Sequence, residues 1–553
     1  MHPSEPFPHF VDDYLAYLYE VLPTQACLDG VHLHDDLLED LSRSAIDADV
    51  RALSGFGRRL RQIDASALSP VEQVDHRIVG SSIESRMYEL EAIRTWDRNP
   101  QVYSDALGMS LAGQALFAYS PEAERARRVV SKLRQVPRLV QAARDNIRET
   151  PGIFVKVGLE AWRGTLKFIE SDLPRAFSTL DDLHILGDLA DTSTEAAAAI
   201  SSYLDYLEND LAPRAKASFR LGRERFEHKL KVEEGITLSA ERLLAVALRE
   251  LHAVQEEFRS VAGRLNGGDP LDVWRRAKEE HPAAGTLVTV AQTHLKELEE
   301  FLQRQGIVTV PPSEPIVVAP TPEFYRWAFA SMWTPGPFET KPSRAYYYLT
   351  DVDKSWPADR QNEHLRDFNL PTLWSISIHE VYPGHFLQAQ HSRQIVDSKV
   401  RKSTLLASNA FVEGWAHYCE QMMMDAGFRR GDHTLRLGQL AEALVRLARF
   451  VVAIRLHCED LSVEQGMRFF RDEAFLEEAT ARREAERGTF DPGYVVYSLG
   501  KLMMLKLRHD YQEQLAGKFS LRSFHDAVLA QGTAPLWAHR RLLLNDTADA
   551  SLE

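Results

Sequence analysis

Helical periodicity along most of the chain is the feature that most constrains its fold. Residues 239–264 show the pattern clearly, because Ser239 can cap a helix, apolar residues recur every three or four positions, and two glycines follow at 267–268. Ser462 followed by Gln465 predicts a capping box at the start of another helix. Similar patterns predict helices at about 10–22, 71–95, 122–149, 194–211, 404–426, 436–459, 463–479 and 497–516. The fold class is therefore expected to be mainly α.

A proline-rich stretch interrupts this helical pattern. Eight of the 26 prolines lie between residues 311 and 342, close to the β-like runs IVVAP (316–320) and AYYYLT (345–350). We expect a small β element near 311–350. A chain of 553 residues is too long for one hydrophobic core, so we expect two helical lobes around a cleft. The expected lobes are an N-terminal one at 1–300 and a C-terminal one at 301–553.

Net charge and cysteine content exclude several classes of protein. Lys and Arg number 65 and Asp and Glu 80, and the resulting net charge of −15 disfavours nucleic acid and anionic membranes as partners. No apolar run is long enough to span a membrane, and the first residues lack the pattern of a signal peptide. Cys27, Cys419 and Cys458 provide no disulfide framework and suit a reducing compartment. The expected location is the cytoplasm.

The segment SISIHEVYPGHFLQAQH (375–391) contains the residue types of a zinc hydrolase. Such a site needs two neutral imidazoles, usually a third protein ligand, and a free carboxylate that takes a proton from water. His379 and His385 can supply the imidazoles, and Glu380 the carboxylate. Six residues separate the two histidines instead of the usual four, so on a regular helix they would point about 120° apart.

The residues between the two histidines can remove this difficulty. Pro383 lacks an N–H group and Gly384 tolerates unusual backbone angles, so the pair can break the helix and turn His385 toward His379. The alternative is a helix that ends at Tyr382, with His385 beginning the next element.

A downstream helix strengthens the metal interpretation. In NAFVEGWAHYCEQMMMDAG (409–427), Glu413, His417 and Glu420 lie on one helical face within an otherwise apolar segment. A buried glutamate is costly unless it is paired or bound to a cation. Glu413 is therefore a candidate third ligand, 28 residues after His385, and His417 or Glu420 could orient a ligand. The alternative is an amphipathic helix with its polar face in solvent, but the two segments together favour a metal site.

These motifs resemble those of a bacterial family called domain of unknown function 885. The H-E-x-x-P-G-H-x-x-Q string from His379 to Gln388 is similar to the family's signature, and E-G-W-A-x-Y from Glu413 is similar to its second motif. PGYVVYSLGK (492–501) is similar to its third motif, and the N-terminal segment beginning FVDDYLAYLYEVL also resembles the family's opening. The resemblance thus extends over nearly the whole chain.

The resemblance implies a helical, zinc-peptidase-like fold of the gluzincin type, in which two histidines and a distant glutamate bind zinc. Carried over to this chain, the ligands are His379, His385 and Glu413, and the general base is Glu380. There is one departure from the family pattern. Many relatives have Asp-x-Gly-Leu-His before the third motif, whereas this chain has AIRLH (453–457), which leaves the substrate preference open.

Four other residues are candidates for the same site. Tyr497 and His457 could donate hydrogen bonds to a developing oxyanion, or could be packing residues with satisfied polar tips. Tyr347 lies on the expected edge strand, where an extended peptide could add by backbone pairing, although a half-buried strand would also explain it. Arg455 could anchor a substrate carboxylate.

Two further features are interpreted as non-catalytic. His32 and His34, next to Asp35 and Asp36, are typical of a solvated turn, with metal binding as the alternative. Cys419 lies beside the candidate site, but a single helical cysteine without an identified basic partner is weak evidence for a thiol hydrolase.

The sequence thus favours a zinc-dependent hydrolase, most consistent with a metallopeptidase that cleaves a peptide or small amide. One zinc ion per chain is the expected cofactor, although imidazole and carboxylate ligands also accept manganese or cobalt. The alternative is a catalytically silent binding protein that keeps the fold. Glu380 favours the enzyme, because a metal-binding scaffold needs no carboxylate next to the first ligand.

Overall fold

The protein is mainly α-helical with a small β-sheet, as expected from the sequence. The structure is a computed structural model that describes residues 5–265, 268–312, 314–322, 326, 329–341 and 344–544. Pro342, one of the prolines in the interrupted stretch, lies outside these residues. No helix of the described residues is both long and apolar enough to cross a membrane.

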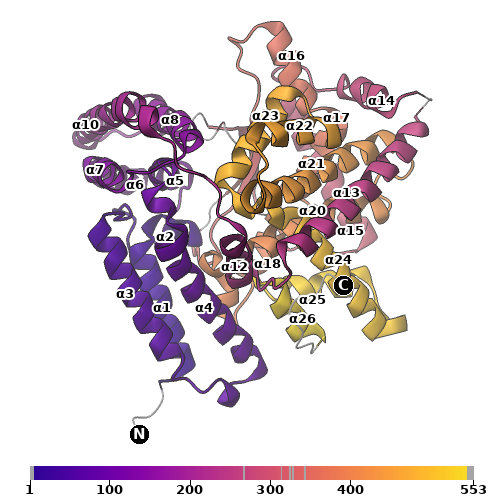
Figure 1. Ribbon diagram of the computed structural model, residues 1–553, viewed down its shortest axis with the longest axis horizontal. Coiled ribbons are helices and arrows are strands. Elements are labelled where there is room, and N and C mark those ends of the chain that lie inside the picture. The colour runs from indigo at the N-terminus through magenta and orange to yellow at the C-terminus, as the bar shows by residue number, and fades with distance from the viewer. Residues whose placement is uncertain are drawn as a thin grey trace.

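The helices before the sheet form two groups, which Figure 1 shows on the left in indigo and purple and, farther right, in magenta. The first group consists of α1 (Phe7–Val21), α2 (Pro23–Asp29), α3 (Arg43–Leu60), α4 (Pro70–Tyr88), α5 (Gln101–Leu116), α6 (Glu122–Leu133), α7 (Val136–Asn146), α8 (Gly152–Lys167), α9 (Leu173–Ala176), α10 (Leu183–Tyr206) and α11 (Ala212–Arg214). The second group consists of α12 (Arg223–Glu234), α13 (Ala240–Gly263), α14 (Pro270–Lys278) and α15 (Leu287–Gln305).

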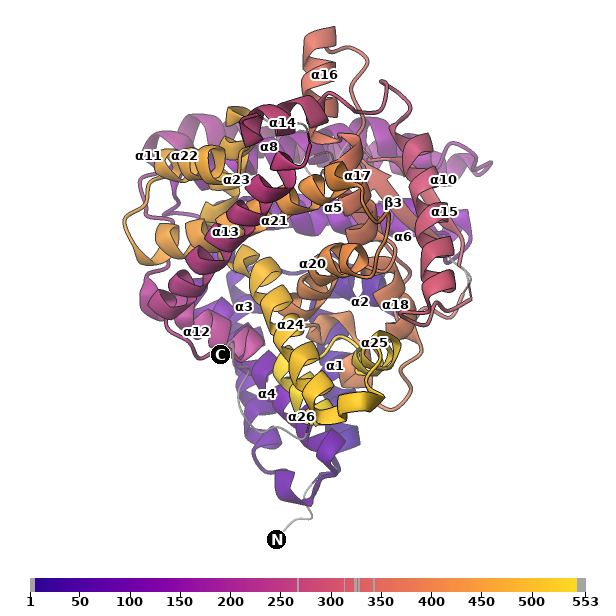
Figure 2. The same ribbon diagram turned by 90° about the vertical axis from the view of Figure 1, so that its right-hand side faces the viewer.

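The helices after the sheet carry the candidate site. They are α16 (Ala358–Asp367), α17 (Leu370–Glu380), α18 (His385–Arg393), α19 (Lys399–Lys402), α20 (Asn409–Asp425), α21 (His433–Cys458), α22 (Val463–Glu473), α23 (Glu478–Phe490), α24 (Val496–Leu515), α25 (Leu521–Leu529) and α26 (Leu536–Leu544). Figure 2 shows α20, α21 and α24 near the centre of the molecule, with α13 alongside α21.

Several helix ends follow directly from the sequence. Ser239 accepts a hydrogen bond from Arg242 N at the start of α13, and Ser462 and Gln465 form the predicted capping box of α22. Several predicted helices are wrong in their extent: α10 begins at Leu183 rather than at 194, and α22 ends at Glu473 rather than at 479. The segment 122–149 forms α6 and α7 rather than one helix, with Pro137 in the first turn of α7, where a missing N–H group costs nothing.

Within the described part of the chain, the sheet has three short strands in the order β1-β3-β2. β3 (Ala345–Leu349) pairs in parallel with β1 (Ile316–Pro320) and antiparallel with β2 (Ala330–Trp333). The expectation that β3 is an edge strand is therefore wrong. The runs at 316–320 and 345–349 are strands as predicted, but a third strand lies between them in sequence.

Among the described residues, the buried side chains form two hydrophobic cores. One core is built mainly by α5–α10. The other combines α1, α3 and α4 with α12–α15 and with the helices of the C-terminal half. Helices on either side of residue 300 are in contact, because α13 packs along α21 and α15 packs against α17, and the predicted division into two lobes stays a prediction. The cleft expected between lobes stays a prediction.

Candidate metal centre

A sharp break between α17 and α18 brings the two histidines of HEVYPGH together. His379 and Glu380 end α17, and His385 begins α18. A Cβ atom at Gly384 would lie 1.7 Å from the carbonyl oxygen of His379, so only glycine allows the chain to turn back this closely. The ring centroids of His379 and His385 are 4.8 Å apart, as the broken helix predicts.

Helix α20 supplies the third group and also holds the break in place. Glu413 Oε2 lies 3.3 Å from His379 Nε2 and 3.5 Å from His385 Nε2. Two residues farther along the helix, the indole Nε1–H of Trp415 donates to the carbonyl oxygen of Pro383 at 2.9 Å. Helix α20 thus presents Glu413 and also, through Trp415, fixes the loop between the two histidines.

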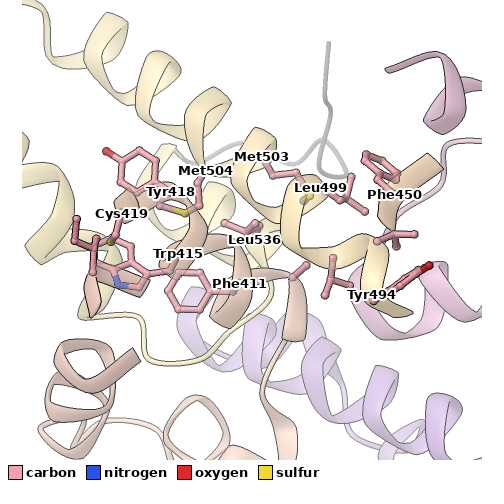
Figure 3. Packing of buried hydrophobic residues seen from close by; sticks show 14 of the residues in the cluster. Phe411, Trp415, Tyr418, Cys419, Phe450, Tyr494, Leu499, Met503, Met504 and Leu536 are labelled. Atoms are coloured by element: carbon pink, nitrogen blue, oxygen red, sulfur yellow. The ribbon is translucent and has the colours of Figure 1, made fainter. Parts of the chain in front are cut away.

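Two glycines of the sequence motifs allow α20 and α24 to pack in close contact. A Cβ atom at Gly500 would lie 1.8 Å from the carbonyl oxygen of Ala410, and one at Gly414 would lie 2.5 Å from the carbonyl carbon of Gly500. Around this crossing, apolar side chains of the two helices interlock, among them Phe411 and Leu499 (Figure 3). The close crossing fixes the position of Glu413 on α20.

A buried carboxylate orients the first histidine. His379 Nδ1 lies 2.7 Å from Glu420 Oε1, and Ser375 Oγ donates to Glu420 Oε2 at 3.0 Å. Arg446 Nη2 is 3.1 Å from Glu420 Oε1. Burial would raise the pKa of Glu420, but the charge of Arg446 outweighs it and holds that pKa well below its ordinary value. The ionised carboxylate accepts the Nδ1–H of His379, which leaves Nε2 as the ring nitrogen that faces Glu413 and would bind a metal ion in place of its proton.

His417, the other residue proposed to orient a ligand, lies beside Glu420 but not against a histidine of the pair. Its Nδ1 is 3.4 Å from Glu420 Oε1 and has no hydrogen-bond partner among the described residues. Burial, together with the charge of Lys501, lowers the pKa of His417 to about 3. His417 is therefore a neutral, buried neighbour, and the orienting contact is made by Glu420.

The three donor atoms fit a transition-metal ion. Those of His379, His385 and Glu413 all lie within 4.8 Å of one another. Two donors about 2.0–2.2 Å from a tetrahedral ion lie about 3.3–3.6 Å from each other, which matches the two distances from Glu413. Glu413 Oε2 is buried and has no hydrogen-bond partner within the described chain. A cation would satisfy this oxygen.

The two carboxylates next to His379, those of Glu413 and Glu420, also favour a bound cation. Burial lowers the pKa of His379, but the carboxylates of Glu413 and Glu420 outweigh it and raise this pKa to about 9. The positive charge next to two carboxylates is supplied here by a proton, and a bound ion would supply it instead.

A comparison with known protein families identifies the family to which the chain belongs. The family described as "Bacterial protein of unknown function (DUF885)" matches residues 23–542, which is nearly the full length. The chain belongs to this family. No curated protein matches the chain.

Two solved structures of similar fold are both candidate lipoproteins. One, of unknown function and from Shewanella oneidensis, is 24% identical with a TM-score of 0.80, and the match covers 98% of this chain and 100% of that one. The other, from Colwellia psychrerythraea, is 17% identical with a TM-score of 0.81, and covers 98% of each chain. At these sequence identities, the structural similarity supports only the fold of this DUF885 chain. The cytoplasmic location expected from the sequence stays a prediction.

Glu380 and Tyr497 lie near the three donors of this family member. Glu380 follows His379 directly and is half-buried, and its charge adds to burial in raising the pKa of the neighbouring Tyr347. The ring centroid of Tyr497 is 6.4 Å from that of His379. Burial and the charge of Glu413 raise the pKa of Tyr497, so its hydroxyl keeps its proton and can donate a hydrogen bond.

Tyr347 does not lie where an added peptide strand could reach it. It is fully buried on the central strand β3, and its hydroxyl is 3.2 Å from Ser377 Oγ on α17. The edge-strand position on which the predicted substrate-binding role of Tyr347 rested is wrong, because both edges of β3 already pair with β1 and β2. Instead, Tyr347 supports the helix that carries His379.

His457 and Arg455 point to other parts of the molecule. His457 Nε2 donates to Gly488 O at 2.8 Å, and His457 Nδ1 accepts from Leu221 N at 3.3 Å. Both ring nitrogens are used by the backbone, so the oxyanion role predicted for His457 does not fit this placement. Arg455 lies over the ring of Phe469 and near Glu459, and its role as a substrate anchor stays a prediction.

Sequence reasoning missed Ser375 and Arg446, the two residues that hold Glu420. Arg446 is buried in α21 within the segment LVRLARFVV (444–452), where an arginine among apolar residues signals a buried ionic partner. Ser375 precedes His379 by one helical turn and gives no such signal. Burial raises the pKa of the Cys419 thiol, which agrees with an inert cysteine.

Proposed function

We propose that this protein is a zinc-dependent hydrolase that cleaves peptide or other amide bonds. The observation that carries the proposal is the position of Glu413 Oε2, which is buried, has no hydrogen-bond partner in the described part of the chain, and lies close to Nε2 of two histidines. Two imidazoles and one carboxylate are the ligand set of many catalytic zinc sites, which keep a fourth position for water or substrate.

His379, His385 and Glu413 would hold the ion, and Glu420 would fix the ring of His379. A bound zinc ion lowers the pKa of a water molecule and polarises a substrate carbonyl. The arrangement is similar to that of gluzincin-type peptidases, in which two histidines and a glutamate distant from them in the sequence bind the metal. The family's own function is not established, so the likeness supports the fold, and the chemistry rests on the site.

Glu380 is assigned as the general base. It is adjacent to His379 but is not one of the three converging groups, so its carboxylate is free to accept a proton. It would take one proton from the attacking water as the new C–O bond forms, and would pass that proton to the leaving nitrogen as the C–N bond breaks. The products are a carboxylate and an amine.

Tyr497 is assigned as a hydrogen-bond donor to the carbonyl oxygen of the substrate. Its hydroxyl keeps its proton, and its ring lies parallel to that of His379 within 25°. A phenol in this position stabilises negative charge that develops on the oxygen. Replacement of Tyr497 by Phe should therefore lower kcat while zinc content stays constant.

The experiment that tests the proposal compares wild type with Glu380→Gln. Zinc-loaded protein is incubated with a mixture of short peptides, and cleavage is followed by mass spectrometry. We expect wild type to cleave at least one peptide, and Glu380→Gln to keep its zinc and lose about 10²–10⁴-fold in turnover. Glu363→Gln, an exposed substitution on α16, is the matched control and should retain full activity.

Two outcomes would contradict these roles. Loss of zinc in Glu380→Gln would make Glu380 a ligand rather than a base. A zinc-loaded wild type that cleaves no peptide or amide substrate would favour the alternative of a silent binding protein that keeps the metal.

A further inference from the structure

A second group of metal-ligand residues lies far from the HEVYPGH motif in the sequence, at the end of α2. Cys27 belongs to α2, and His32 and Asp35 belong to the turn that follows it. The ligand atoms of these three side chains lie within 4.8 Å of one another. The interpretation of this segment as a solvated turn is wrong for Asp35, which is only 2% exposed.

His32 is held in the same way as His379. Its Nε2 lies 2.9 Å from Glu339 Oε2, and its other nitrogen, Nδ1, faces Asp35 Oδ2 at 3.0 Å. Its ring stacks flat on Tyr119, with centroids 3.7 Å apart. A carboxylate on the outer nitrogen and a candidate ligand on the inner one is the usual arrangement of a metal-binding histidine.

Asp35 has one oxygen that is satisfied and one that is not. Oδ2 accepts from the hydroxyl of Tyr119 and lies 3.1 Å from Arg128 Nη1. Oδ1 is buried and has no hydrogen-bond partner among the residues that the structure describes. An orphaned carboxylate oxygen of this kind is costly unless a cation or an ordered water contacts it.

The sulfur of Cys27 accepts a hydrogen bond from a neighbouring amide. Gln114 Nε2 donates to Cys27 Sγ at 3.4 Å, which is the kind of contact that supports a metal-bound sulfur. The carboxylates of Asp35 and Glu339 flank the two nitrogens of the His32 ring, and a divalent cation can balance their negative charge.

Two members of the group, Cys27 and His32, line a small cavity at the junction of two segments. A cavity of about 10 Å³ lies between Cys27, His32 and Glu339, close to the volume that one water molecule needs. The segments are in tight contact, because a Cβ atom at Gly336 would lie 2.2 Å from the backbone of Asp29. Phe338 N also donates to Asp29 O at 3.0 Å.

We propose that Cys27, His32 and Asp35 bind a second transition-metal ion, for which zinc is the best match, and that this ion fastens the turn after α2 to the segment around Glu339. A thiolate, an imidazole and a carboxylate form a mixed sulfur, nitrogen and oxygen set that suits zinc. Asp35 supplies the carboxylate ligand, Glu339 orients His32, and the small cavity beside Cys27 and His32 has room for one water-sized ligand. The role is structural and independent of the proposed hydrolysis.

Cobalt substitution distinguishes this site from the first one. Thiolate ligands give cobalt(II) a sulfur-to-metal charge-transfer absorption in the near ultraviolet, whereas the donors at His379, His385 and Glu413 contain no sulfur. Wild type titrated with cobalt(II) should develop this band with one equivalent of thiolate-bound metal. His379→Ala/His385→Ala, which removes the first site, should keep the band. Cobalt binding to wild type without a thiolate band would overturn the proposal, whether or not the protein cleaves peptides.

Variants of the cysteines locate the ligand. Cys27→Ser should abolish the charge-transfer band and reduce the zinc content, measured by plasma mass spectrometry, by one ion per chain. Cys458→Ser is the matched control and should change neither, because Cys458 lies on α21 outside both groups. If Cys27→Ser fails to fold, alkylation of wild type gives the answer: zinc should slow the modification of Cys27 at least tenfold, and an unchanged rate would overturn the proposal.

Discussion

His379 Nδ1 lies 2.7 Å from Glu420 Oε1, on the side of the ring opposite the nitrogen that faces Glu413. This contact decides which nitrogen of His379 is free, and Ser375 and Arg446 in turn hold the carboxylate that makes it. A buried ionic network that extends from α17 through α20 to α21 therefore supports the candidate centre on the Nδ1 side of His379.

Replacement of Glu420 by Gln should weaken metal binding without removing a ligand. The amide keeps the shape of the side chain but loses the charge that fixes the Nδ1–H tautomer of His379, so zinc affinity should fall about 10–100-fold. Isothermal titration of metal-free protein measures this. Glu442→Gln is the matched control, because Glu442 also pairs with Arg446 but does not contact His379. Equal losses in both variants would show that Glu420 acts only through Arg446.

The turn at Gly384 should not tolerate any side chain. Gly384→Ala places a methyl group against the backbone of His379, so we expect a loss of about 3 kcal/mol or more in the free energy of unfolding and a large loss of zinc affinity. Gly164→Ala on α8 is the control, since no heavy atom of the described chain outside its own helix turn lies within 4 Å of the added carbon. The control should be neutral or stabilising by up to about 1 kcal/mol. A Gly384→Ala protein with unchanged zinc affinity would contradict the role of the break.

The placement of Tyr347 leads to an expectation opposite to the one from the sequence. Tyr347→Phe removes the hydroxyl that contacts Ser377, which should cost about 1 kcal/mol in the free energy of unfolding. Because the ring is buried on the central strand, KM for any cleaved peptide should change little. Chemical denaturation and steady-state kinetics measure the two effects. A large rise in KM with unchanged stability would restore the substrate-binding role.

Stability should fall as pH rises through the range in which Glu234 titrates. Burial raises the pKa of Glu234 from an ordinary 4.5 to about 7, and its carboxyl group is hydrogen-bonded to Ser408 and to Ala410 N at the start of α20. Above pH 4.5 the unfolded chain loses this proton while the folded chain retains it, so the free energy of unfolding decreases until about pH 7.

Glu234→Gln mimics the protonated side chain and should remove this dependence. The variant should be close to wild type in stability at pH 4.5 and more stable than wild type at pH 8, as measured by urea denaturation at both values. Glu256→Gln, an exposed substitution on α13, is the control and should show no such difference. A constant difference between Glu234→Gln and wild type across this range would contradict the assigned pKa shift.

The approach of His379 to His385 and the shared helical face of Glu413 and Glu420 could be predicted from the sequence because their signals are local. Pro383 and Gly384 break the helix within the motif, and the spacing of Glu413 and Glu420 places both on one face of α20. The capping box at Ser462 is local in the same sense. Each of these features depends on residues within about two helical turns of one another.

The features that could not be predicted depend on partners far away in the sequence. The central position of β3 is set by pairing with two other strands, which a run of three tyrosines does not specify. His32 looked like part of a solvated turn because its partner Glu339 lies 307 residues later. His457 lies in a motif-like position, but its contacts with Leu221 and Gly488 are set by the packing of α12 and α23 around α21.

The most direct test of the central claim is anomalous diffraction at the zinc absorption edge from crystals of the wild-type protein soaked in zinc. The account predicts a strong peak about 2.0–2.2 Å from Nε2 of His379, Nε2 of His385 and a carboxylate oxygen of Glu413. The peak should be absent from crystals of His379→Ala/His385→Ala. A wild-type map with well-ordered side chains at these three residues and no anomalous peak between them would contradict the account.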